Sequence, residues 1–167
     1  MLMLAATLAG CGFRAEKLFS GYATIEVREV GRSLACNSPG DAVRAQILPD
    51  LKAVRDWQGA RGVRFPGDDA LLPAPYALVE MGARPTGGYG LAVARSAVLR
   101  GELLILEATF VSPSPGSLVT EALTSPCVLV QLPPGRYSSV EVDDPGGAVR
   151  ATGGVGPVLP QAGAPAS

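Results

Sequence analysis

The chain has no histidine among its 167 residues. Without an imidazole it lacks the usual base of serine and cysteine nucleophiles and the usual nitrogen ligand of zinc. A serine–lysine pair would have to use Lys17 or Lys52, and neither lies near a glycine-flanked serine. We therefore expect a protein that is not an enzyme, with no metal site and no cofactor.

An excess of charge of either sign is also missing. The chain carries 14 basic and 15 acidic side chains, and its arginines are scattered from Arg14 to Arg150. Because nucleic-acid binding needs a concentrated basic patch, we expect no nucleic-acid partner. Phe, Trp and Tyr together make up 5% of the residues, which disfavours a sugar-binding face built from several aromatic rings.

The sequence has no apolar run of the roughly 20 residues that a membrane-spanning helix needs. Its start is apolar nevertheless, and the pattern Leu8-Ala9-Gly10-Cys11 resembles the lipobox of bacterial lipoproteins. That resemblance implies a signal peptide over residues 1–11, an acylated Cys11, a short tether over 12–21 and a periplasm-facing domain on the cell envelope. Gly12 is not the aspartate of an inner-membrane retention signal, which favours the outer membrane. The alternative is a buried N-terminal strand or helix.

Two further cysteines, Cys36 and Cys127, remain if Cys11 carries the lipid. In an oxidising compartment they can pair as a disulfide. They can equally be two small buried thiols, because free cysteine packs well in cores. The spacing leaves both possibilities open.

Hydrophobic periodicity predicts an α+β domain over residues 22–144. Residues 22–30 alternate like a half-buried strand, and residues 41–57 show apolar spacings of three and four, with Pro49 placing the helix start near Leu48. Five short apolar runs follow, separated by turn residues, and they predict a mainly antiparallel β-sheet meander with one packed helix. The runs cover residues 76–82, 89–99, 102–111, 127–133 and 137–144. Because the 102–111 run is apolar on both faces, we expect the helix to cover one of them.

The C-terminal segment, residues 145–167, has no apolar period and no aromatic residue. Gly, Ala and Pro make up 15 of its 23 residues. A segment with so few large apolar side chains has little to bury, so we expect a disordered tail.

The glycine-rich stretch RPTGGYG, Arg84 to Gly90, has neither P-loop nor dinucleotide-binding spacing. Adjacent acids, Asp68-Asp69 and Asp143-Asp144, are typical of solvated turns and lack the alternating ligands of an EF-hand. A recognition loop or a structural turn remains for residues 84–90.

Three motifs occur in order in the second half of the chain. They are Gly82-x-Arg84-Pro85-Thr86-Gly87-Gly88-Tyr89, Pro113-x-Pro115-Gly116 and Thr120-x-Ala122-Leu123-Thr124-Ser125-Pro126. The segment that carries them, residues 76–144, resembles the C-terminal domain of the PrcB family of protease-complex subunits. The resemblance implies a small domain, common in secreted bacterial proteins and lipoproteins, whose namesake type is a non-catalytic companion of a surface protease.

In a meander, alternate connections lie at the same end of the sheet, so the 83–88 turn and the long 112–125 connection should be neighbours. Long connections in compact domains are often functional. The candidate partner-binding residues are Arg84, Thr86, Gly87, Gly88, Tyr89, Thr120, Glu121, Thr124 and Ser125. The alternative is structural: Pro85 and the glycines fix the turn, Arg84 bonds loop carbonyls or Glu121, and Tyr89 packs on the sheet.

These features together predict a non-catalytic, lipid-anchored binding module with a protein partner in the cell envelope. The resemblance suggests a protease as that partner. Two alternatives stay open: a protease inhibitor-like domain, and a binder of envelope glycan or a small ligand.

Overall fold

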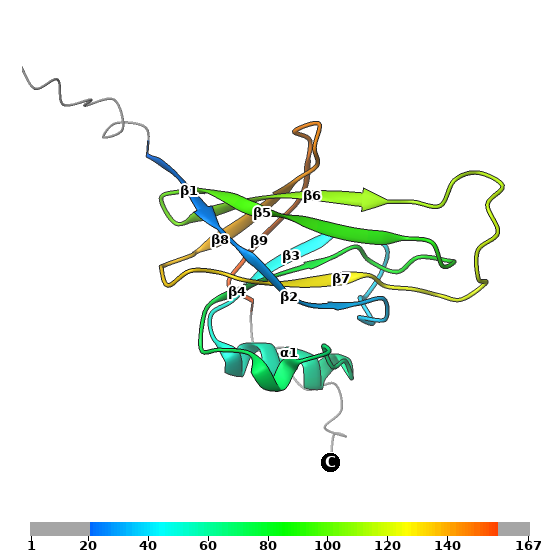
Figure 1. The fold of residues 1–167 in the computed structure, drawn as a ribbon, viewed down its shortest axis with the longest axis horizontal. Coiled ribbons are helices and arrows are strands. Elements are labelled where there is room, and N and C mark those ends of the chain that lie inside the picture. Colours follow the sequence, from blue (N-terminus) through cyan, green and yellow to red (C-terminus); the bar gives the residue numbers. More distant parts are fainter. Residues whose placement is uncertain (1–20, 157–167) are drawn as a thin grey trace, which may run out of the picture.

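The computed structural model describes residues 21–156, which fold as two packed β-sheets and an α-helix (Figure 1). The strand order is β1-β5-β6-β8-β9 in the larger sheet and β2-β7-β4-β3 in the smaller. This confirms the α+β class with a mainly antiparallel sheet and a single short α-helix among the described residues. The bounds are β1 Tyr22–Glu26, β2 Arg28–Ser33, β3 Arg44–Leu48, α1 Leu51–Arg61, β4 Tyr76–Glu80, β5 Gly90–Arg100, β6 Leu103–Val111, β7 Cys127–Gln131, β8 Ser139–Asp143 and β9 Val149–Gly154.

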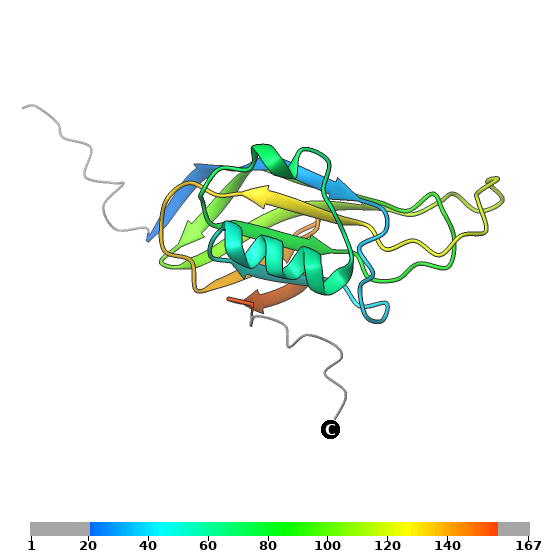
Figure 2. The ribbon, with the colours of Figure 1, turned by 90° about the horizontal axis from the view of Figure 1, so that it is seen from below.

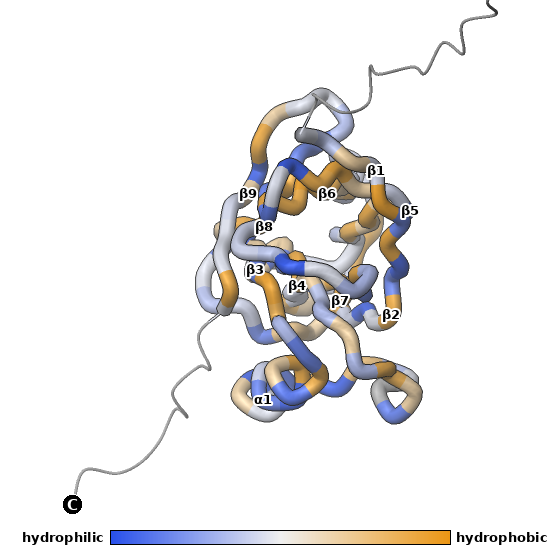
Figure 3. Tube along the Cα trace, turned by 90° about the vertical axis from the view of Figure 1, so that its left-hand side faces the viewer, coloured by the Kyte–Doolittle hydropathy of each residue, from blue (hydrophilic) through white to orange (hydrophobic). Residues whose placement is uncertain are grey.

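The main core lies between the two sheets. Alternate residues of β6 and β8 point inward from the larger sheet, and residues of β4 and β7 meet them from the smaller one. Leu104, Leu106 and Val140 are fully buried there. Figure 3 shows the strands as a ring, seen along the long axis of the molecule, with α1 outside it.

The helix α1 covers the outer face of the smaller sheet (Figure 2). Its first turn is capped by the Asp50 carboxylate, which accepts a hydrogen bond from the Ala53 amide at 2.8 Å. Its end is closed by Gly62 at φ 63°. Val54 and Trp57 pack into a second apolar cluster with residues of β3, β4 and β7.

The prediction for residues 41–57 was wrong in two respects. The helix begins at Leu51 rather than near Leu48, and it covers the smaller sheet rather than the 102–111 strand. Residues 44–48 form β3, which pairs antiparallel with β4. Ile47 and Leu48 are both buried, on opposite faces of this strand. Together with the later apolar residues, they therefore matched the spacing expected for one face of a helix.

The strands do not form a meander. Consecutive strands β4 and β5 lie in different sheets, and so do β6 and β7. β6 and β8 pair in parallel, since the chain crosses to the smaller sheet and back between them. The two long connections, residues 81–89 and 112–126, therefore both pass from one sheet to the other.

The predicted disordered tail is wrong for residues 149–154, which form β9 on the edge of β8. The glycines that suggested disorder allow close packing here. A Cβ at Gly153 would overlap the carbonyl oxygen of Ala45 in β3, and the Gly156 amide donates to the Ile47 carbonyl at 2.9 Å. β9 thus joins the two sheets at one side. Residues 157–167 lie outside the described part of the chain.

Cys36 and Cys127 are joined by a disulfide with a Cα–Cα distance of 6.0 Å. Both residues are buried, and Cys127 is the first residue of β7. Cys11 and most of the proposed tether fall in residues 1–20, outside the described residues. Between residues 21 and 156, no helix has the length and hydrophobicity needed to cross a membrane.

Candidate functional site

The predicted recognition residues gather at one end of the molecule, formed by residues 83–89 and 112–125, which we call the two-loop end (right side of Figure 1). Arg84 and Thr124 exchange backbone hydrogen bonds of 2.7 and 2.9 Å. The Gly87 amide donates to the Thr120 carbonyl at 2.9 Å, and the Thr124 hydroxyl donates to the Thr86 carbonyl at 2.8 Å. The expected neighbourhood of the two loops is confirmed. The cause is not a meander, because each of the two loops connects one sheet to the other.

Two motif glycines have left-handed backbone angles and lie too close to neighbouring atoms for a side chain. Gly82 has φ 84°, and a Cβ there would overlap the backbone of Asp41. Gly88 has φ 82°, and a Cβ there would press on the side chains of Val119 and Pro113. Because other residues rarely adopt such backbone angles, Gly82 lets the start of the first loop pack on the segment after β2, and Gly88 lets this loop pack on the longer one.

Arg84 folds back into its own loop. Its Nη2 donates to the Met81 carbonyl, and its guanidinium lies 5.7 Å from the centroid of the Tyr89 ring. Its Nε is buried and has no hydrogen-bond partner among the described residues. Glu121 is exposed, and residues 21–156 show no ion pair between it and Arg84. Arg84 therefore packs as part of the loop.

Ser125, another predicted contact residue, lies at the base of the longer loop, where it is 7% exposed. Its hydroxyl accepts from the Ser38 amide at 3.0 Å, and its carbonyl accepts from the Cys36 amide at 2.9 Å. With the disulfide beside it, Ser125 fixes the base of the loop to the segment after β2. Thr120 and Glu121 lie on the exposed part.

Two leucines of the longer loop project into solvent, and neither is among the partner-binding residues predicted from the sequence. Leu118 is 104% exposed and Leu123 is 83% exposed. Leu118 lies between a turn closed by the Ser117 amide on the Ser114 carbonyl (3.0 Å) and the Gly87–Thr120 bond. Both ends of its segment are thus held. One sequence feature could have identified these leucines. Each is a large apolar residue in a Pro- and Gly-rich loop, where no strand or helix pattern accounts for it.

A buried carboxylate, that of Glu80, was likewise not predicted from the sequence. Glu80 is 2% exposed and accepts a 2.7 Å hydrogen bond from the Ser38 hydroxyl. Nη2 of Arg61 lies 3.5 Å from it, while Nη1 of Arg61 donates to the Asn37 carbonyl at 2.6 Å. A carboxylate paired in this way is a structural tie between α1 and the loop after β2.

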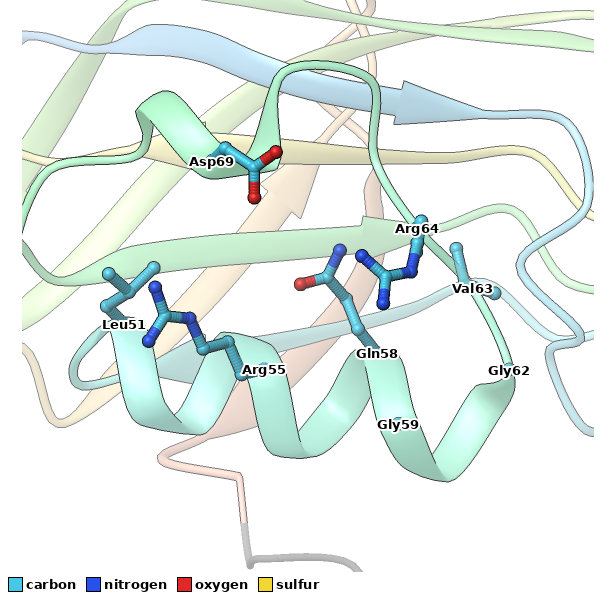
Figure 4. Close-up of a pocket in the computed structure, with 8 residues that line it drawn as sticks. All are labelled: Leu51, Arg55, Gln58, Gly59, Gly62, Val63, Arg64 and Asp69. Atoms are coloured by element: carbon cyan, nitrogen blue, oxygen red, sulfur yellow. The ribbon is translucent and has the colours of Figure 1, made fainter.

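An open hollow of about 780 Å³ lies between α1 and the segment that follows it (Figure 4). Two cationic side chains, Arg55 and Arg64, share it with the anionic Asp69. The described residues place no nucleophile beside a base here, and residues 21–156 contain no cluster of three or more His, Cys, Asp or Glu side chains that could hold a metal ion. The lining residues are Leu51, Arg55, Gln58, Gly59, Gly62, Val63, Arg64 and Asp69. Opposed charges in an open hollow make it a weaker candidate than the two-loop end.

Comparison with known proteins bears on the same region. No curated protein and no solved structure shows a significant match to the chain. A family model described as PrcB C-terminal matches residues 76–133. The matched segment begins at β4 and ends just after β7, so it contains both loops and the three motifs. The two-loop end is thus built by the part of the chain that matches the PrcB C-terminal family.

Proposed function

We propose that the chain is a non-catalytic binding module that holds a protein partner through the two-loop end. The observation that carries the proposal is the exposure of Leu118 and Leu123 on a loop whose base is tied by hydrogen bonds and a disulfide. Exposed apolar side chains on a well-held loop are typical of contact residues, because little conformational entropy is lost when they are buried.

The energetics are adequate for such a role. Burying one leucine side chain contributes about 1.5–3 kcal/mol, so two of them supply a substantial part of a micromolar affinity, which corresponds to about 8 kcal/mol. The neighbouring Thr120 and Glu121 offer a polar rim around this pair. The partner surface that fits is an apolar groove with hydrogen-bonding groups at its border.

The proposed location is the cell envelope, with a lipid on Cys11 that holds the domain at the periplasmic side of the outer membrane. The Leu8–Cys11 pattern supports this proposal. The proposed partner is an envelope protein, and the PrcB resemblance supports a protease as its class.

The test is capture of partners from detergent-solubilised envelopes with the wild-type protein and with a Leu118→Ser/Leu123→Ser variant. Both side chains are exposed, so the variant should keep the wild-type Tm while losing the captured protein. Leu72→Ser is the matched control, because Leu72 is 59% exposed but belongs to the segment between α1 and β4. Capture that is equal for all three proteins would contradict the proposal.

A second candidate is an inhibitor-like domain, favoured by the way Leu118 is held between two hydrogen-bonded points. Such a residue can enter a protease cleft as a substrate side chain does. Stoichiometric inhibition of proteases that prefer leucine, lost in Leu118→Ser, would support it. Rapid cleavage next to Leu118 or no inhibition at all would leave the binding module as the better description.

A further inference from the structure

Strand β5 is longer than the strand that pairs with its outer edge. It runs over Gly90–Arg100, whereas β1 pairs with Ser96–Arg100. The Val27 amide then donates to the Arg95 carbonyl at 2.9 Å, and the chain leaves this edge to pair with β7 as β2. On the side away from β6, residues 90–94 therefore face no strand within the described part of the chain.

This edge carries open backbone groups. In an antiparallel ladder, every second residue points its N–H and C=O away from the paired strand. Gly90 to Val93 pair with Val111 to Ala108 of β6, and no other backbone–backbone hydrogen bond of residues 90–94 occurs within residues 21–156. The outward groups of this stretch are available to a further strand.

The stretch Gly90 to Val93 lacks the charged side chains that usually protect a free edge, and the register shift of β5 begins only after Val93. Proteins block exposed edges with charged side chains and bulges. β2 follows that rule, with Arg28, a Glu29–Arg32 ion pair of 2.7 Å and a register shift between Glu29 and Gly31. Residues 90–94, Gly-Leu-Ala-Val-Ala, carry no charge.

The space beside the edge suits one extended chain. Val27 is the crossover, the residue at which the chain passes from β1 in the larger sheet to β2 in the smaller one. From this point β5 and β2 diverge towards the two-loop end (Figure 1). A hollow of about 1120 Å³ lies at the crossover, lined by Glu26, Val27, Arg28, Glu29, Val93, Ala94, Arg95, Ser96, Gln131, Leu132, Pro133 and Pro134. An added strand needs about 4.8 Å beside β5. Arg28 and Glu29 of β2 line the same hollow as Val93 and Ala94 of β5, so the occupant argued for here is a single extended chain rather than a second sheet.

We propose that residues 90–94 of β5 accept an extended peptide segment of a second protein by β-strand addition. Main-chain hydrogen bonds to the open edge provide the affinity. Alternate side chains of the peptide lie on the core side, next to half-buried Val93, and on the solvent side, next to exposed Ala92, so the segment alternates small apolar and polar residues. This edge begins beside the two-loop end, at Gly90, but it does not include the two leucines.

The experiment selects linear peptides from a random phage-displayed library on the full chain and synthesises the strongest binder. Amide hydrogen exchange of the complex should show new protection within residues 90–94. A scan of single N-methyl groups along the peptide should weaken binding at every second position, by about tenfold or more, and leave the positions between unchanged.

Matched variants test the protein side. Ala92→Lys places a charge on the open edge, whereas Thr109→Lys places the same charge on its exposed cross-strand neighbour in β6. The first variant should weaken peptide binding about tenfold and the second should not, with equal Tm values for both. The Leu118→Ser/Leu123→Ser variant should bind the peptide like wild type, which keeps this test separate from that of the proposed function.

Several results would overturn the proposal. They are failure of the library to yield a binder, protection at the two-loop end instead of residues 90–94, and an N-methyl scan without a two-residue period. A concentration-dependent dimer that protects the same amides would show that the occupant is a second copy of this chain.

Discussion

At the scale of single residues, Asp144 organises the turn between β8 and β9. Its Oδ1 accepts from the Gly146 and Ala148 amides, both at 3.0 Å, and its Oδ2 lies 3.4 Å from Nη1 of Arg150. The hydrogen bond from the Ala148 amide is the main cause that lowers the pKa of Asp144 below its ordinary value, with the Gly146 amide and Arg150 adding to it. The turn therefore prefers the ionised carboxylate.

The sign of the pH effect follows from this lowered pKa. The contribution of Asp144 is fully present above the unfolded pKa, about 3.9, and is lost as the pH falls through the lower folded value. We expect the Gly146 and Ala148 amide NMR signals to shift with a midpoint below 3.9. In Asp144→Asn, which keeps an acceptor oxygen, these shifts should be absent. A midpoint at or above the ordinary aspartate value would contradict the prediction.

Arg84 provides a second residue-scale prediction. Arg84→Ala removes the donor to the Met81 carbonyl and the contact with Tyr89, so it should cost about 1–3 kcal/mol of unfolding free energy. Thermal and denaturant unfolding measure this cost. Thr120→Ala is the control, because the backbone of Thr120, not its side chain, binds Gly87. An unchanged Tm together with lost partner capture would instead make Arg84 a direct contact residue.

At the scale of elements, the apolar runs predicted the strands β4 to β8 well. Each of these strands shows a clear apolar run between turn residues. β3 was missed because its two faces are both buried, and β9 because its glycines serve close packing rather than flexibility. The pairing order could not be predicted, since the choice between neighbouring strands depends on contacts far apart in the chain.

Truncation tests the role of β9. Removing residues 145–167 strips β9 from the edge of β8 and uncovers β3, so the Tm should fall by about 5 °C or more, equivalent to roughly 1 kcal/mol. Removing residues 157–167 keeps β9 and should leave the Tm nearly unchanged. Equal Tm values for the two truncations would show that β9 adds nothing to stability.

The disulfide is the second element-scale test. It closes a loop with a sequence separation of 91, for which chain entropy suggests about 4–5 kcal/mol. Reduction should lower the Tm and speed amide exchange at Ser125, which lies two residues before Cys127. Because both sulfurs are buried, a Cys36→Ala/Cys127→Ala variant serves better than reductant in the native state. Unchanged amide exchange at Ser125 would show that the disulfide does not stabilise the base of the longer loop.

At the scale of the whole molecule, the candidate site was only partly predictable. The motifs located the two loops, because glycines and prolines at fixed positions mark a specific backbone path. They did not show that Arg84 and Ser125 turn inward while Leu118 and Leu123 turn outward. Side-chain direction in a loop depends on the segment packed against it, here the residues after β2 and the opposite loop.

Membrane attachment is the whole-molecule prediction. The wild-type protein should partition into detergent with an acylated N-terminus, whereas Cys11→Ala should stay in the aqueous phase, since two or more acyl chains give lasting attachment. Phase separation followed by mass spectrometry of the N-terminal peptide measures both. A wild-type protein that stays aqueous and keeps Met1 would refute the anchor.

The position of β1 has a consequence for how such an anchored protein meets its partner. β1 begins at one extreme of the longest axis, and the two-loop end lies at the other (Figure 1). If Cys11 carries the proposed lipid, the point of attachment ahead of β1 and the two-loop end with Leu118 and Leu123 lie at opposite ends of the domain. The proposed anchor would then leave the two-loop end free to meet a partner that extends away from the bilayer.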